Sequence, residues 1–107
     1  MNWIKIFDSL DIAVKTVPHQ SSKLLIIGGR KICLTNIKGE FFALDDKCPH
    51  RGASLSEGIV NYLGEVICPL HEYRFSSKTG CETDNKCDDA VVFKVKNKND
   101  GVYISIS

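Results

Sequence analysis

The hydrophobic and polar positions along the chain predict short strands separated by tight turns. The apolar run Leu24 to Ile27 ends at Gly28-Gly29, and Lys31 to Thr35 follows it. Asn36 to Gly39 supplies a turn before the next strand, which we expect over Glu40 to Leu44. Apolar runs of this length with glycine between them are typical of β-structure.

The C-terminal region repeats this organisation. Ala90 to Lys96 leads through Asn97 to Gly101 into Val102 to Ile106, where apolar and polar residues alternate as in a strand with one buried face. No stretch of a dozen residues has helical periodicity, although Asp8 to Val14 could form a short turn of helix. We therefore predict an all-β fold, a small sandwich or barrel in which residues 46 to 85 form an inserted lobe.

Length and charge narrow the class of protein. The chain has 107 residues and a net charge of +1, so we expect one domain over residues 1–107 with a modest core. Lysines and acids are interspersed, which argues against the basic stripe of a nucleic-acid-binding protein. Met1 to Asp8 contains no long apolar run, so we expect no signal peptide and no membrane anchor, with a cytoplasmic location as the default.

Four residues that can bind metal lie in two short segments. Cys48, His50, Cys68 and His71 follow the pattern C-x-H-x17-C-x2-H, with a proline directly after each cysteine. Two thiolates and two imidazoles are the ligands of a [2Fe-2S] cluster in which histidine replaces cysteine on one iron. This pattern makes iron-sulfur electron transfer the leading hypothesis.

The two segments resemble the cluster-binding segments of the Rieske [2Fe-2S] family, with the strongest match over residues 46 to 81. The resemblance implies one [2Fe-2S] cluster per chain and a small Rieske-type β-fold. It also implies that Cys48 and Cys68 bind the inner iron, while His50 and His71 bind the outer, more exposed iron.

Two other interpretations of the four residues compete with the cluster. A zinc module could use two cysteines and two histidines, but such modules usually pair cysteine with cysteine and histidine with histidine. Cys48 and Cys68 could instead form a disulfide, although disulfides are rare in reducing compartments. We keep a zinc-bound structural module as a distant alternative.

Positions around the ligands indicate a branch of the family. The high-potential branch has an additional cysteine in each segment, joined as a disulfide, where this chain has Ala53 and Leu70. That branch also has serine and tyrosine hydroxyls directed at sulfur, where this chain has Tyr73 and Phe75. We expect a disulfide-free cluster at the low end of the range of about −150 to +300 mV.

The chain lacks residues for further catalytic chemistry. The mononuclear iron of a Rieske oxygenase needs two more histidines and a carboxylate, and only His19, which we expect in a surface loop, remains. Gly28-Gly29 is not a dinucleotide-binding motif, so no flavin or nicotinamide site is predicted. We predict an electron-transfer protein or oxidoreductase component, not an enzyme in itself, with no nucleic-acid or membrane partner.

Two functions remain open. The first is a Rieske-type ferredoxin that carries single electrons from a flavoprotein reductase to a terminal oxygenase. The second is the small subunit of a complex like NADH-dependent nitrite reductase, because the ligand segments resemble that subunit too. The presence of all four ligand residues favours the ferredoxin.

Three cysteines lie outside the motif. Cys33 stands in an apolar run, so we expect it in the core. Cys81 and Cys87 could be separate thiols, a disulfide or a redox-sensitive pair. They lie in an acidic stretch, residues 81–89, which we call the covering segment because relatives use this region, often with prolines, to cover the cluster. Its acids are expected to be solvated or to attract a basic partner.

Overall fold

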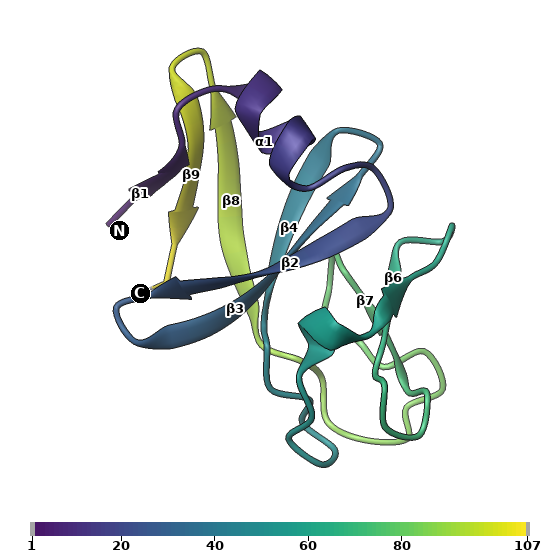
Figure 1. Cartoon of the computed structure of the whole chain (residues 1–107). Helices are drawn as coiled ribbons and strands as arrows, with labels where there is room; N and C mark the ends of the chain where they lie inside the picture. Colours follow the sequence, from purple (N-terminus) through teal and green to yellow (C-terminus); the bar gives the residue numbers. More distant parts are fainter. Residues whose placement is uncertain (1, 107) are drawn as a thin grey trace.

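The larger part of the molecule is a curled, antiparallel six-stranded sheet (Figure 1). The computed structural model describes residues 2–106. The spatial order of the strands is β1-β9-β8-β4-β3-β2. Their bounds are β1 Ile4–Phe7, β2 Ser21–Ile27, β3 Arg30–Ile37, β4 Glu40–Asp45, β8 Val92–Lys98 and β9 Gly101–Ser105.

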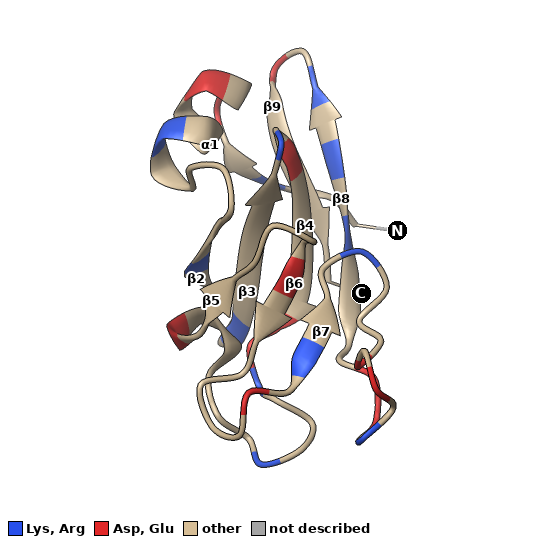
Figure 2. Ribbon diagram, turned by 90° about the vertical axis from the view of Figure 1, so that its right-hand side faces the viewer, with Lys and Arg blue, Asp and Glu red and all other residues tan. Residues whose placement is uncertain are grey.

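A smaller lobe is inserted between β4 and β8. It contains a second antiparallel sheet in the order β5-β6-β7, preceded by a 3-10 turn, η1. The two ligand segments lie at the end of the molecule remote from α1, as Figures 1 and 2 both show. The all-β prediction with an inserted lobe is confirmed. The bounds are η1 Leu55–Glu57, β5 Ile59–Val60, β6 Glu65–Ile67 and β7 Arg74–Ser76.

Turn chemistry sets the register of the meander β2-β3-β4. Gly28 and Gly29 both have positive φ, 57° and 79°, as do Lys38 and Gly39, at 54° and 88°. Two-residue turns with positive φ at both positions match the twist of the strands that they join. These turns pair Ile27 with Arg30 and Ile37 with Glu40, so each hairpin closes directly.

The short helix α1, Leu10–Thr16, begins two residues later than the segment predicted from Asp8. Ser9 sets this start because its hydroxyl accepts a 3.1 Å hydrogen bond from the Ile12 backbone N–H. Ala13 and Val17, four residues apart, are fully buried against the sheet. Within residues 2–106, no helix is long and apolar enough to span a membrane.

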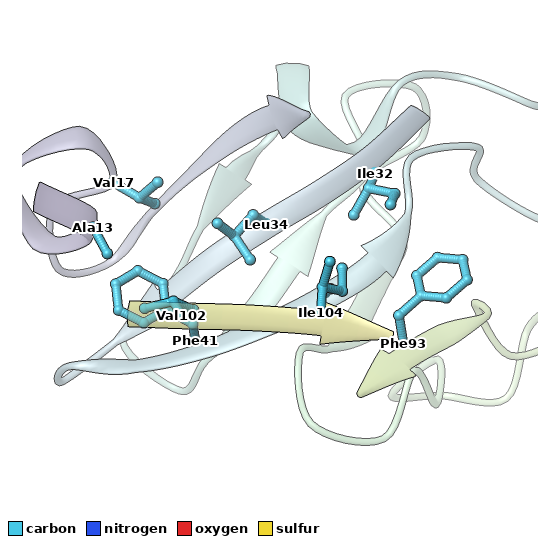
Figure 3. Close-up of a cluster of buried hydrophobic side chains, with 9 residues drawn as sticks. Ala13, Val17, Ile32, Leu34, Phe41, Phe93, Val102 and Ile104 are labelled. Atoms are coloured by element: carbon cyan, nitrogen blue, oxygen red, sulfur yellow. The ribbon is translucent and has the colours of Figure 1, made fainter. Parts of the chain in front are cut away.

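Strand β3 separates two hydrophobic cores. Ile32 and Leu34 point into the first core, where they meet side chains from α1, β4, β8 and β9 (Figure 3). Cys33 between them is fully buried in the second core, as predicted, and burial raises the pKa of its thiol to about 12. Because successive strand residues face opposite sides, β3 is buried on both faces.

The second core attaches the lobe to the large sheet. Leu44 of β4 and Phe75 of β7 are both fully buried in it, and each such side chain stabilises the fold by about 1.5–3 kcal/mol. Both motif cysteines belong to this core. Its buried members are Cys33, Leu44, Cys48, Leu55, Val60, Val66, Cys68, Phe75 and Ala90.

Candidate iron-sulfur cluster site

The first ligand loop, residues 48–53, is closed by two backbone hydrogen bonds. The Cys48 N–H donates to the carbonyl of Ala53 at 2.9 Å, and the Gly52 N–H donates to the carbonyl of Cys48 at 2.8 Å. Asp46, only 3% exposed, anchors the loop from its N-terminal side by accepting a 2.8 Å bond from the Ser56 N–H. The residues that brace this loop are therefore its own neighbours in sequence.

The second ligand loop, residues 68–73, repeats these two bonds at the same offsets. The Cys68 N–H donates to the carbonyl of Tyr73 at 2.8 Å, and the Glu72 N–H donates to the carbonyl of Cys68 at 3.1 Å. His71 and Glu72 have φ values of 80° and 59°, in the left-handed region that side chains other than glycine seldom occupy. The two loops thus present their cysteines in the same backbone frame.

The covering segment braces the second loop through a buried acid. Glu82 is only 2% exposed, and its carboxylate accepts hydrogen bonds from the backbone N–H groups of Arg74, Asp84 and Lys86 at 3.3, 2.9 and 2.7 Å. The expectation that the acids of this segment are solvated is therefore wrong for Glu82. A carboxylate can be buried when it accepts this many bonds.

The four motif side chains form a site with a buried and an exposed side. Cys48 and Cys68 are each 1% exposed, and their thiols interact with one another. His71 is exposed and His50 half-buried, and their ring centroids are 5.3 Å apart at an interplanar angle of 64°. The structure brings Cys48 together with Cys68 and His50 together with His71, with the thiols inside and the imidazoles toward the surface.

This arrangement fits the ligand shell of the predicted cluster. With metal–nitrogen bonds of about 2.1 Å, two imidazoles on one tetrahedral metal have ring centroids about 5 Å apart. The observed separation of 5.3 Å agrees with this value. The paired thiols could supply the two sulfur ligands that the other iron of such a cluster requires.

The surroundings of the site shift the pKa of both a cysteine and a histidine of the motif. Burial raises the pKa of the Cys68 thiol, and the nearby thiols of Cys48 and Cys87 raise it further. Desolvation lowers the pKa of His50, as do the charges of Arg51 and His71. A low histidine pKa keeps the imidazole neutral and able to bind metal, whereas the thiols must release protons to do so.

The candidate metal-binding side chains form pairs. Among residues 2–106, no three His, Cys, Asp or Glu side chains converge on a position that could hold one metal ion. A structural zinc site needs four ligands around a single ion, whereas each iron of a Rieske cluster needs only two from the protein.

The other predicted residues are placed as follows. All five cysteines of the chain are free, so neither the Cys48–Cys68 nor the Cys81–Cys87 disulfide is formed. Cys87 packs against the second core, beside the ligand thiols, while Cys81 is exposed. His19 lies in an exposed loop, as predicted, and its Nδ1 accepts a 2.8 Å hydrogen bond from the Lys38 N–H.

The sequence did not reveal how Tyr73 is used. Its ring stacks on the His50 imidazole, with centroids 4.2 Å apart and an interplanar angle of 25°. Phe75 is fully buried in the second core and has no hydroxyl to offer to a cluster. The position of Tyr73 two residues after His71, a candidate ligand, is the only local signal that could have suggested an aromatic contact in the site.

Comparison with known proteins agrees with this site. The family model described as Rieske [2Fe-2S] domain matches residues 2–97, and the chain belongs to this family, whose cofactor is one [2Fe-2S] cluster. The chain is 39% identical, over 77 residues, to the 3-phenylpropionate/cinnamic acid dioxygenase ferredoxin subunit of Photorhabdus laumondii. The match covers 71% of this chain and 73% of that subunit.

Two solved structures share the fold over nearly the whole chain. The ferredoxin of carbazole 1,9a-dioxygenase from Nocardioides aromaticivorans IC177 superimposes with a TM-score of 0.84 at 19% identity, covering 100% of both chains. A chain in the complex of reduced oxygenase and oxidized ferredoxin in carbazole 1,9a-dioxygenase gives a TM-score of 0.80 at 25% identity, covering 95% of this chain and 100% of that one. The predicted Rieske fold is confirmed.

Proposed function

We propose that this protein is a one-electron carrier that passes electrons from a flavoprotein reductase to a terminal oxygenase. The observation that carries the proposal is the pairing of two buried thiols with two surface imidazoles in one site. Cys48 and Cys68 are the proposed ligands of the inner iron, and His50 and His71 those of the outer iron. When bound, a [2Fe-2S] cluster accepts and donates single electrons.

The proposed site has a buried half, formed by the cysteines, and an accessible half, formed by the histidines. The second core excludes water from Cys48 and Cys68, which protects the inner half of the site. His71 is exposed and His50 half-buried, so the imidazoles form the surface through which a docked partner would exchange an electron. The proposed role of these four residues is to hold the cluster, and no residue is proposed to be catalytic.

A potential at the low end of the Rieske range forms part of the proposal. All cysteines are free, and Phe75 has no hydroxyl, so the loop disulfide and one hydroxyl donor of the high-potential branch are missing. Hydrogen bonds to cluster sulfur are a main determinant of the potential, and their loss lowers it.

The partner classes are inferred from relatives. The names of the Photorhabdus subunit and of the carbazole dioxygenase complex associate their ferredoxins with oxygenases. These relatives favour the ferredoxin over the nitrite reductase small subunit. A reductase, and a cytoplasmic location where reduced nicotinamide is available, complete the proposed route.

The proposal is tested on the protein purified without oxygen. Iron, zinc and acid-labile sulfide are measured first, and about two irons and two sulfides per chain are expected. Stopped-flow spectroscopy then follows reduction by the flavoprotein reductase of a three-component dioxygenase, and reoxidation by the matching oxygenase. Zinc without sulfide would favour the structural module. Stable co-elution with a sirohaem-containing subunit, together with failure to accept electrons from the reductase, would contradict the ferredoxin.

A further inference from the structure

Tyr73 contacts both ligand loops. Its carbonyl oxygen accepts the 2.8 Å hydrogen bond from the Cys68 N–H that closes the second loop. Its ring stacks on the imidazole of His50 in the first loop, at a centroid separation of 4.2 Å. One residue therefore connects the two halves of the site through its backbone on one side and its ring on the other.

The Tyr73 ring is held by two further contacts. It packs against the second core, which contains both ligand cysteines. The Lys86 ammonium lies over the ring, with Nζ 5.4 Å from the centroid, a cation–π distance. Lys86 is fixed in turn by the bond from its backbone N–H to the buried Glu82 carboxylate. The covering segment thus restrains Tyr73.

We infer that Tyr73 is a cross-loop tie, whose ring positions the imidazole plane of His50 relative to the second loop. The inference rests on the proposed function, because it takes His50 as a ligand of the outer iron. Metal-binding histidines need outer contacts that fix the orientation of the ring, and stacking supplies one here. The chain has Ala53 and Leu70 where the high-potential branch has its loop disulfide, so the stacked pair is a non-covalent connection between loops that lack a covalent one.

Three variants distinguish stacking by the Tyr73 ring from its apolar contact with the second core. Tyr73→Phe keeps the ring and removes only the hydroxyl. Tyr73→Leu keeps apolar contact with the second core but cannot stack. Tyr62→Leu is the matched control, because Tyr62 lies in the same lobe and is 79% exposed.

The first measurement is the rate at which an iron chelator removes the cluster. Loss of an aromatic pair should accelerate removal from Tyr73→Leu by about two- to tenfold relative to wild type. Tyr73→Phe and Tyr62→Leu should keep the wild-type rate. Equal rates for Tyr73→Leu and Tyr73→Phe would overturn the inference.

The second measurement reports on the histidines themselves. Pulsed EPR of the reduced protein, with 15N-labelled histidine, resolves the nitrogen couplings of the two ligands. In Tyr73→Leu, the coupling of one histidine should broaden and that of the other should stay unchanged. A purely structural role would change both couplings or neither, and either result would contradict positioning of His50.

Failure of the tie and failure of the proposed function give different results. Wild-type protein without iron and sulfide contradicts the proposed function, whereas loaded wild type with indifferent Tyr73 variants overturns only the tie. If Tyr73→Leu does not fold, Lys86→Met replaces it as the test. Removing the cation over the ring should accelerate cluster loss by about two- to fivefold, and an unchanged rate would count against the tie.

Discussion

The two ligand loops reach the same backbone frame by different means. In each, the cysteine N–H bonds to the carbonyl five residues later, and the fifth residue of the loop, Gly52 or Glu72, has positive φ. The first loop uses glycine there and is anchored by the adjacent Asp46. The second loop uses Glu72 and depends on Glu82 from the covering segment. Asp46 reaches ten residues along the chain, to Ser56, and Glu82 reaches eight, to Arg74. The loops therefore differ in the side from which the anchor comes, before the first loop and after the second.

The largest effect is expected at the cysteine that begins each loop. Cys48→Ala and Cys68→Ala should each abolish cluster binding, because each removes one of the two thiolates of the inner iron. Iron and sulfide analysis checks this, with Cys81→Ala, at an exposed cysteine, as the control that keeps its cluster. Retention of a full cluster in either ligand variant would refute the equivalence of the loops.

The next largest effect is expected at Gly58, which lies between the two loops in sequence and packs closely against the backbone of Ile67. A Cβ on Gly58 would lie 1.8 Å from the Ile67 carbonyl oxygen, directly before Cys68, so Gly58→Ala should lower the free energy of unfolding by about 3 kcal/mol or more. Gly52→Ala is the matched comparison, since its Cβ would come no closer than 3.5 Å, to Lys47, and only its φ of 76° is unfavourable. We expect about 1–2 kcal/mol there. Chemical denaturation measures both free energies of unfolding. Equal losses would contradict the expectation that the close backbone contact at Gly58 costs more than the unfavourable φ at Gly52.

Removing Glu82 should affect the covering segment and the end of the second loop, but not the first loop. Glu82→Ala leaves the backbone N–H groups of Arg74, Asp84 and Lys86 without their buried acceptor and should destabilise the protein by about 2 kcal/mol. Glu82→Gln keeps an acceptor oxygen and should lose less, and Glu57→Ala, at an exposed acid, should have little effect. Hydrogen exchange should accelerate at residue 74, directly after the second loop, and at residues 84 and 86 of the covering segment, but stay unchanged at residue 52. Acceleration in both loops would show that they are not braced separately.

The smallest effect is a gain in stability. Glu72 has a φ of 59° at the position equivalent to Gly52, so Glu72→Gly should relieve backbone strain and raise the free energy of unfolding by about 1 kcal/mol. Glu72→Ala retains the strain and should be nearly neutral. Thermal unfolding of the two variants compares them, and a loss of stability in Glu72→Gly would mean that the Glu72 side chain supports the loop.

Features set by residues close together in the sequence could be predicted, whereas contacts between distant segments could not. The hairpins around β3 were predictable because Gly28-Gly29 and Lys38-Gly39 define turns within a few residues. The four candidate ligands could be named because their spacing is local within each loop. The pairing of β1 with β9, Ile4 with Ile104, joins the two ends of the chain and leaves no local pattern.

The covering segment shows why the rest could not be predicted. Glu82 stands among several acids and has the sequence context of a solvated residue, yet three backbone N–H groups make its burial favourable. In the sequence, Tyr73 only occupies the position of a serine of the high-potential branch, which indicates a hydroxyl group and not a stacked ring. Its contact with His50 depends on how the two loops meet in space, which the spacing of the ligands does not define.

The most direct test of the central claim is pulsed EPR of the reduced wild-type protein with 15N-labelled histidine. If the loops place Cys48 and Cys68 on one iron and His50 and His71 on the other, the spectrum will show strong couplings to nitrogen from two histidines. A [2Fe-2S] signal without histidine nitrogen coupling, or with coupling to only one histidine, would contradict the account.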